Sequence, residues 1–168
     1  MTLSDEIKGI LDCYVIQNAE QLLAEKRKES FRKTRDNINN ILSEKLYTWL
    51  SDNEESLKGN NISFSRNERS VTLLFNDFTI EISFSGSSKD KHQGPEARYE
   101  GFVNWSFDPP KSVKKARTSG TAYTYTELHV NLDYSHDRSY LEQQIKQEFT
   151  QERFKEILLT SLRDSLLN

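Results

Sequence analysis

The chain has 168 residues, 35% of them hydrophobic and 29% charged, and a formal net charge of −3. This length fits one domain with at most an appendage, and the lean apolar content indicates that part of the N-terminal helical region stands away from the core. The single cysteine, Cys13, excludes an internal disulfide and is typical of a reducing compartment. An acidic start is unlike a secretory leader, and no apolar run reaches the roughly 18 residues of a membrane span. We therefore expect a cytoplasmic protein that does not enter a membrane.

Residues 1–58 are predicted to be helical. Apolar residues recur at spacings of three and four in two series, the first from Ile7 to Leu22 and the second from Phe31 to Leu50. Because neither Gly nor Pro stands between them, one helix of roughly 45 residues, about 70 Å long, is possible. A helix hairpin that turns near Ser30 is the alternative.

From Gly59 onward the apolar period shortens to two, which is typical of β-strands. The dipeptide Asn76-Asp77 separates two alternating segments and predicts a tight hairpin. Further alternating segments are expected at residues 99–107 and 128–134. We predict an antiparallel sheet of four to five strands that is buried on one face.

A long amphipathic helix is predicted at the C-terminus. Ser139 and Glu142 have the spacing of a capping box, and apolar residues from Leu141 to Leu166 follow a helical period. The fold class is therefore α+β, with this helix packed on one face of the sheet. We expect residues 59–168 to form one cooperative domain with residues 1–58.

Motifs that carry catalysis are absent from the sequence. The six glycines are too widely spaced for a Gly-x-Gly turn or a P-loop, and there is no paired cysteine motif, His-Glu-x-x-His or Gly-x-Ser-x-Gly. The residues His129, Asn131 and Asp133 share one strand face, with His136 following, so a divalent cation is geometrically possible. Outward polar residues of a half-buried strand are the simpler interpretation. We expect no cofactor, no metal and no catalytic residue.

The segment KRKESFRKTR, residues 26–35, is the most basic part of the chain, with six bases and one acid. In a helix, Lys28, Arg32 and Arg35 fall within about 60° of one another and form a basic stripe. Ion pairs from Glu29 to Lys33 and from Arg32 to Asp36 would neutralise part of this charge, and the net charge of −4 on residues 1–25 would repel phosphates. The stripe is a solvated helix face, a contact for an acidic protein or dimer mate, or a nucleic-acid contact.

A second candidate surface is the outward face of the sheet, where Phe102, Tyr123 and Tyr125 alternate out of phase with the buried series. Exposed aromatic side chains can anchor a protein partner or stack on bases, unless another element covers them. A basic linker adjoins this face and offers possible nucleic-acid contacts at Lys111, Lys114, Lys115 and Arg117.

Three functional hypotheses follow. The leading hypothesis is a non-enzymatic cytoplasmic protein that binds another protein, as an inhibitor, immunity protein, adaptor or chaperone does, with a homodimer through the N-terminal helices as one form of that binding. The alternative is a nucleic-acid-binding module that uses residues 26–35 and 111–117 with the sheet aromatics. The least favoured is a metal-dependent hydrolase at His129, Asp133 and His136.

Overall fold

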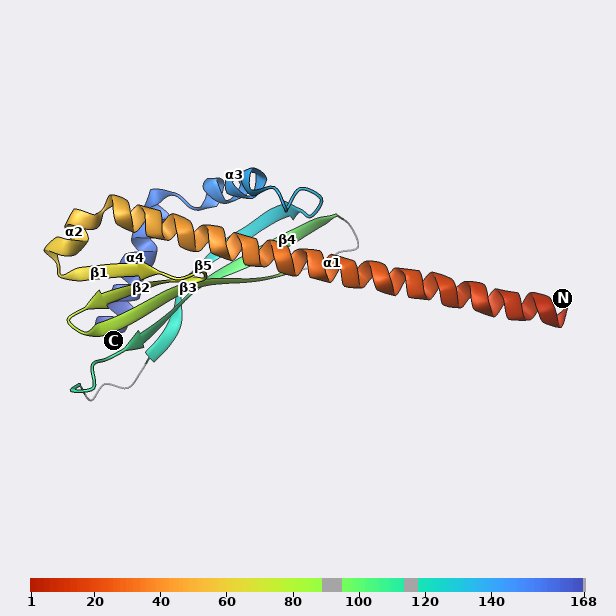
Figure 1. Cartoon of the computed structure of the whole chain (residues 1–168), viewed down its shortest axis with the longest axis horizontal. Helices are drawn as coiled ribbons and strands as arrows, with labels where there is room; N and C mark the ends of the chain where they lie inside the picture. Colours follow the sequence, from red (N-terminus) through yellow and green to blue (C-terminus); the bar gives the residue numbers. More distant parts are fainter. Residues whose placement is uncertain (89–94, 114–117, 168) are drawn as a thin grey trace.

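A five-stranded antiparallel sheet carries helices on one face, and one helix extends far beyond it (Figure 1). The computed structural model describes residues 1–88, 95–113 and 118–167, without the side chains of residues 122–126. This arrangement confirms the predicted α+β class.

The N-terminal helix α1 runs without a break from Leu3 to Asp52, so the single-helix alternative is correct and the hairpin is not formed. Its start is a capping box in which the Thr2 hydroxyl accepts from the backbone N–H of Asp5 and the Asp5 carboxylate accepts from that of Thr2. A short helix, α2 (Glu54–Gly59), follows and turns the chain into the sheet.

The strands are β1 (Ile62–Arg66), β2 (Ser70–Phe75), β3 (Phe78–Ser88), β4 (Glu96–Asp108) and β5 (Thr118–Asn131), and they lie in sequence order. Asn76 and Asp77 connect β2 to β3 with φ values of 44° and 70°. Two left-handed residues in succession are what a two-residue hairpin turn requires, and Asn and Asp tolerate that conformation. The predicted hairpin is therefore confirmed.

The C-terminal segment forms two helices, α3 (Arg138–Glu148) and α4 (Gln151–Leu166), where one was predicted. The break lies at Phe149, whose buried ring contacts Phe84 and Phe154, and Thr150 then caps α4 by accepting from the N–H of Arg153. The cap of α3 is Asp137, not Ser139: its carboxylate accepts from the Ser139 N–H at 2.9 Å. Both helix starts thus follow ordinary N-cap chemistry at positions the capping-box pattern did not indicate.

One face of the sheet supplies the core. Alternate strand residues are buried and pack against the second half of α1 and against α3 and α4. The opposite face carries polar or partly exposed residues such as Glu81 and Phe102. The core members from the sheet include Val71, Leu73, Ile80, Ile82, Phe84, Tyr99, Val103, Trp105, Phe107, Leu128 and Val130.

Candidate functional site

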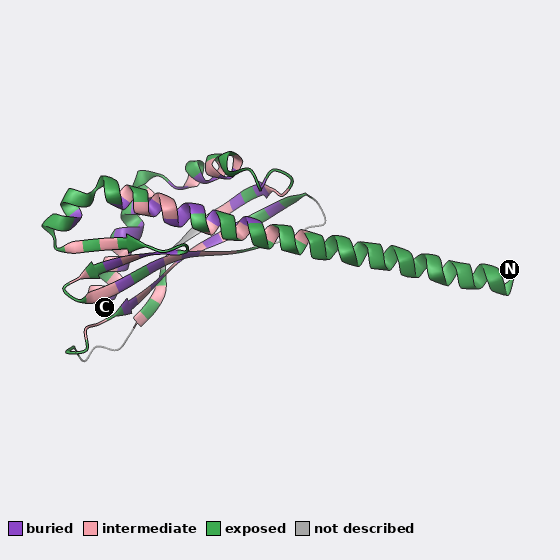
Figure 2. Ribbon diagram, in the orientation of Figure 1, coloured by how far each residue is buried: buried purple, intermediate pink, exposed green. Residues whose placement is uncertain are grey.

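The first half of α1 projects from the rest of the protein as a helical arm (Figure 1). Every residue from Met1 to Lys26 is exposed (Figure 2), so we call residues 3–26 the arm. Burial begins a few residues later, where Phe31 packs on the core and Thr34 and Ile38 are enclosed. The remaining parts of the protein, from Phe31 onward, are called the body.

An apolar face runs along the arm, with Asn18 and Gln21 interrupting it between Val15 and Leu22. At 100° per residue its large side chains fall within an arc of about 140°, and their exposed fractions range from 49% for Ile7 to 72% for Leu3. Two further apolar residues, Ile16 and Leu23, lie outside this arc. The arm stripe consists of Leu3, Ile7, Ile10, Leu11, Tyr14, Val15 and Leu22.

Charge divides α1 into two zones. Residues 1–25 carry five acids and one base, and residues 26–35 carry six bases and one acid. The arm is therefore acidic overall and meets the basic segment at the edge of the body. Among the described residues, no helix has the length and hydropathy together that a bilayer crossing requires.

Polar contacts fix the arm to the body at the first point of contact. The buried hydroxyl of Thr34 hydrogen-bonds that of Ser135 at 2.7 Å, and one turn further on the hydroxyl of Tyr99 donates to the side chain of Asn39. The Ser43 hydroxyl donates to the carbonyl of Arg69 at 2.9 Å. Because these bonds join α1 to different elements, the direction in which the arm leaves the body is firmly set.

The basic stripe lies at the base of the arm. Lys28 is exposed and Arg35 is half-buried beside Asp36, at 3.5 Å. The guanidinium of Arg32 makes two hydrogen bonds to Glu29, at 2.6 and 3.0 Å, which raises the pKa of Arg32 and lowers that of Glu29. Part of the positive charge is thus neutralised locally, although by a pair different from those predicted.

The second predicted surface is described only in part. Phe102 is half-buried on the outward face of β4, and its register partner on β5 is Thr124; Val103 pairs with Tyr123 and Gly101 with Tyr125. The side chains of Tyr123 and Tyr125 lie outside the described residues, as do Lys114, Lys115 and Arg117. Lys111 is exposed.

The residues of the hydrolase hypothesis, His129, Asp133 and His136, are all exposed. The side chain of Asn131 accepts from the backbone N–H of Asp133 at 3.0 Å and so shapes the turn after β5. Within the described part of the chain, no three His, Cys, Asp or Glu residues gather as a metal ion would need.

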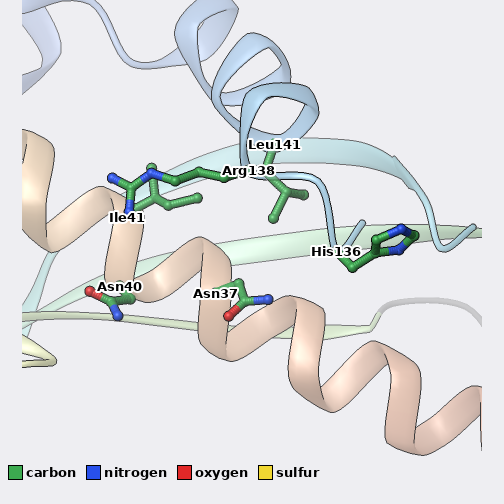
Figure 3. A pocket seen from close by; sticks show the side chains of 6 residues that line it. All are labelled: Asn37, Asn40, Ile41, His136, Arg138 and Leu141. Atoms are coloured by element: carbon green, nitrogen blue, oxygen red, sulfur yellow. The ribbon is translucent and has the colours of Figure 1, made fainter. Parts of the chain in front are cut away.

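His136 instead lines a small cleft of about 160 Å³ between α1 and the start of α3 (Figure 3). Arg138, on the same rim, bonds to Glu44 and Glu142, and Asn40 accepts from Arg66 at 2.7 Å. The strongest polar groups of the cleft are therefore engaged within the protein.

An apolar groove of about 530 Å³ lies at the end of the body remote from the arm tip. It runs between the end of α1, α2, β1 and α4, and its lining includes Trp49, Leu57, Ile62, Leu158 and Leu162. Its apolar lining residues are buried or half-buried except Leu159, whereas every residue of the arm stripe is exposed.

The arm stripe is the surface that the sequence-based site prediction missed. The spacing of Ile7, Leu11, Tyr14 and Leu22 predicts an amphipathic helix. A helical period does not tell, however, whether the apolar face packs against another part of the same chain or stays exposed. The signal that could have found it is the polar interval at residues 26–30, which separates the two apolar series. In the structure this interval spans the part of α1 between the arm and Phe31, the first residue that packs on the core.

Comparison of the chain with profiles of protein families, with curated proteins and with solved structures finds no match.

Proposed function

We propose that this protein is a non-enzymatic, cytoplasmic protein-binding factor, of the kind that includes inhibitors, immunity proteins, adaptors and chaperones, and that the arm stripe is its principal binding surface. One observation carries the proposal: seven large apolar side chains lie exposed on one side of the arm, none of whose residues is buried or half-buried in the described structure. Contiguous apolar patches of this extent mark interaction sites on soluble proteins.

The arm helix is less stable while its apolar face is in water. Helices obtain most of their stability from packing an apolar face, and a helix with an apolar face in solvent forgoes that stabilisation. Docking on a protein groove or on another helix recovers it. The groove-bound amphipathic helix, with contacts at spacings of three and four, is a common mode of protein recognition.

Charge favours a protein over the other macromolecular partners. Helices that lie on membranes carry Lys and Arg on the polar face, whereas residues 1–25 carry five acids and one base. The same acids oppose phosphate contacts along the arm. At its base, Arg32 is held by Glu29 and Arg35 lies beside Asp36, which leaves the nucleic-acid alternative with less support than the protein-binding function.

Two isoleucines on opposite sides of the arm provide a matched test. Ile7 belongs to the arm stripe and Ile16 lies about 180° away, and the two are 49% and 58% exposed. The full chain, immobilised through a C-terminal tag, is used to capture proteins from a lysate of its native host, at two salt concentrations, with and without nuclease. Captured proteins are then identified by mass spectrometry.

We expect wild type and Ile16→Ser to retain the same proteins after nuclease treatment, and Ile7→Ser to bind them at least about tenfold more weakly, the effect of removing an interface anchor. Equal retention by all three chains would exclude the arm stripe as the binding surface. Loss of all retained material on nuclease treatment, with steep salt dependence, would favour the nucleic-acid alternative instead.

A further inference from the structure

We propose that a cleft beside β3 binds the C-terminus of an extended peptide, which adds to the edge of β3 as a further strand and places its terminal carboxylate between Arg35 and Arg69. This site is separate from the arm stripe, so the inference goes beyond the proposed function and is tested independently of it. It is carried by the unequal lengths of β2 and β3, by a cleft at the place where β2 begins, and by the charges that line this cleft.

One edge of β3 is open along part of its length. β2 begins at Ser70, which pairs with Ser83, whereas β3 continues to Ser88. Among the described residues, Phe84 to Ser87 therefore have a strand beside them only on the other side, where β4 pairs with β3. Such an edge is a template for a further strand, because its N–H and C=O groups point outward.

The turn between β2 and β3 determines which backbone groups face this edge. Because this turn has two residues with positive φ, Phe75 and Phe78 form a hydrogen-bonded pair, and the backbone groups of Phe78 point to β2. The direction alternates with a period of two, and the register of β3 is continuous with both neighbours. The N–H and C=O of Gly86 therefore point to the side of β2, at a level that β2 does not reach.

A cleft of about 290 Å³ lies against this edge. It is lined by Arg35, Asp36 and Asn39 of α1, by Arg69 of the turn between β1 and β2, and by residues 84–86 of β3. Its volume is just below the roughly 300–1,000 Å³ of pockets that hold small ligands. The cleft therefore suits the end of a peptide better than a whole cofactor.

Two guanidinium groups make the cleft positive. Arg69 is exposed, its N–H donates to Asn67 and its carbonyl accepts from Ser43, each at 2.9 Å. Within the described part of the chain, no carboxylate forms an ion pair with the Arg69 guanidinium. Nε of Arg35 lies 3.5 Å from Asp36, further than the about 2.7–2.9 Å of a strong charge-assisted bond. With two bases and one acid, the lining keeps a positive charge for a carboxylate.

Two further donors complete the site. The side-chain oxygen of Asn39 accepts from the buried Tyr99 hydroxyl, which leaves the Asn39 amide nitrogen as a donor. The other donor is the N–H of Gly86. When the last residue of the peptide lies opposite Gly86, this N–H donates to the terminal carboxylate, and the N–H of the last residue donates to the Gly86 carbonyl.

The turn between β1 and β2 selects the direction of the peptide. Ser70 pairs with Ser83, so Arg69 stands on the line along which an added strand would continue past Gly86. The added strand must therefore end at the cleft. A peptide antiparallel to β3 presents its C-terminus to Arg69, whereas a parallel peptide would present a positively charged N-terminus to two arginines. Charge thus favours the antiparallel peptide and its terminal carboxylate.

Peptide libraries test the site. Hexapeptides with four randomised residues at the C-terminus are prepared as free acids and as C-terminal amides, and those retained by the full chain are identified by mass spectrometry. We expect only free acids to be enriched. A retained peptide should bind at least about tenfold more weakly to Arg35→Gln and to Arg69→Gln in calorimetric titration, because each change removes a charge-assisted hydrogen bond. The matched control is Arg163→Gln, an exposed arginine of α4 outside the cleft, which should bind as wild type does.

Addition as a strand is measured at Gly86. On peptide binding, we expect the amide proton of Gly86 to shift downfield and to exchange with water more slowly, while that of Gly9 on the arm stays unchanged. A peptide that is N-methylated at its last residue cannot donate to the Gly86 carbonyl and should bind at least about tenfold more weakly. Binding without either effect would overturn the strand addition.

Retention of no free acid by the wild-type chain, or equal retention of acids and amides, would overturn the proposal. Amides that are retained only when they contain Asp or Glu would show that the cleft takes a side-chain carboxylate, which overturns the terminal one. Ile7→Ser should bind the peptides as wild type does, and Arg69→Gln should leave capture through the arm stripe unchanged. The failure of this proposal is therefore distinguishable from the failure of the proposed function.

Discussion

The hydroxyl groups of Thr34 and Ser135, 101 residues apart in the chain, meet at 2.7 Å in the interior at the point where α1 passes from arm to body. The Thr34 hydroxyl also lies 2.8 Å from the carbonyl oxygen of Ser30, one turn earlier, and the Ser135 hydroxyl lies 2.9 Å from that of Leu132, so the two hydroxyl protons are shared among three oxygen contacts. The contact therefore ties the first docked turn of α1 to the loop that leads into α3.

Replacing Thr34 by Val removes this hydroxyl and keeps the shape of the side chain. We expect Thr34→Val to lower the free energy of unfolding by about 1–2 kcal/mol, because the buried Ser135 hydroxyl loses a partner. Urea denaturation measures the change, and the double variant with Ser135→Ala should cost less than the two single changes together. Additive losses would mean that the two hydroxyls do not interact.

Gly86 leaves room for the ring of Tyr99. A Cβ atom at Gly86 would lie 1.9 Å from Cε2 of Tyr99, which is fully buried and whose hydroxyl bonds to Asn39 on α1. We expect Gly86→Ala to destabilise the protein by about 1–3 kcal/mol, since overpacking displaces the ring. The control is Gly9→Ala on the arm, where a Cβ meets nothing within 4 Å and helix propensity favours Ala. A neutral effect of Gly86→Ala in thermal unfolding would contradict this packing.

Substitutions at two isoleucines on α1 compare how much the arm and the docked half of the helix contribute to the free energy of unfolding. Ile38 is 1% exposed and Ile16 is 58% exposed. We expect Ile38→Ala to cost about 2–5 kcal/mol through lost burial and the cavity left behind, and Ile16→Ala to change stability by less than about 0.5 kcal/mol. Chemical denaturation of both variants checks the difference, and similar losses at the two positions would show that the arm is docked in solution.

Stability at acid pH should depend on Glu44. The hydrogen bond from Arg138 holds the pKa of Glu44 below its ordinary value of 4.5, and burial opposes this less strongly. A carboxyl group whose pKa is lowered by folding stabilises the protein above its ordinary pKa and loses that contribution as the pH falls through the folded value. Because the Glu44 side chain is 40% exposed, we expect only about 0.5 kcal/mol.

The variant Glu44→Gln should accordingly be slightly less stable than wild type at pH 7 and should lose less stability below about pH 4.5. Arg138 also bonds to Glu142, at 2.9 Å, so Glu142→Gln is the matched control for the loss of one carboxylate from the same guanidinium. Thermal unfolding between pH 7 and pH 3 measures both. Parallel curves for Glu44→Gln and wild type would show that this ion pair makes no pH-dependent contribution.

Reversal of the basic stripe separates folding from binding. Lys28 and Arg32 are exposed and Arg35 is half-buried, so we expect the triple change to Glu to leave the far-ultraviolet circular dichroism spectrum unchanged. We expect no wild-type affinity for mixed-sequence duplex DNA at physiological salt. Measurable binding whose dependence on salt weakens by about three phosphate contacts in the triple variant would instead establish a nucleic-acid role.

Local chemistry explains which parts of the fold could be predicted. Asn76-Asp77 indicates a two-residue turn because few other residues accept left-handed backbone, and the strands follow from strict alternation on a half-buried sheet. The lack of Gly and Pro between Leu22 and Phe31 permits a continuous α1 but does not exclude a hairpin near Ser30, so the sequence left both alternatives open. The turn and the strands depend on neighbours in the sequence, so the sequence is sufficient to predict them.

Features that depend on distant contacts were missed. The helix break at Phe149 has no Gly or Pro to mark it, and it forms because the ring is buried against Phe84 of β3 while Thr150 supplies a new cap. Likewise, Ile7 and Ile38 belong to similar apolar series, although one is exposed and the other is in the core. Only the three-dimensional arrangement shows that the first series stays exposed beside the part of the chain that the structure describes.

The unbroken course of α1 has a mechanical consequence. Because its 50 residues form one rod of about 75 Å, with its second half packed against the sheet, α3 and α4, there is no joint at which the arm can swing independently. A load applied at the tip is transmitted to the core as torque, with the hydrogen bond between Thr34 and Ser135 close to the fulcrum. The molecule is thus a lever, and whatever grips its tip sets the orientation of the whole sheet.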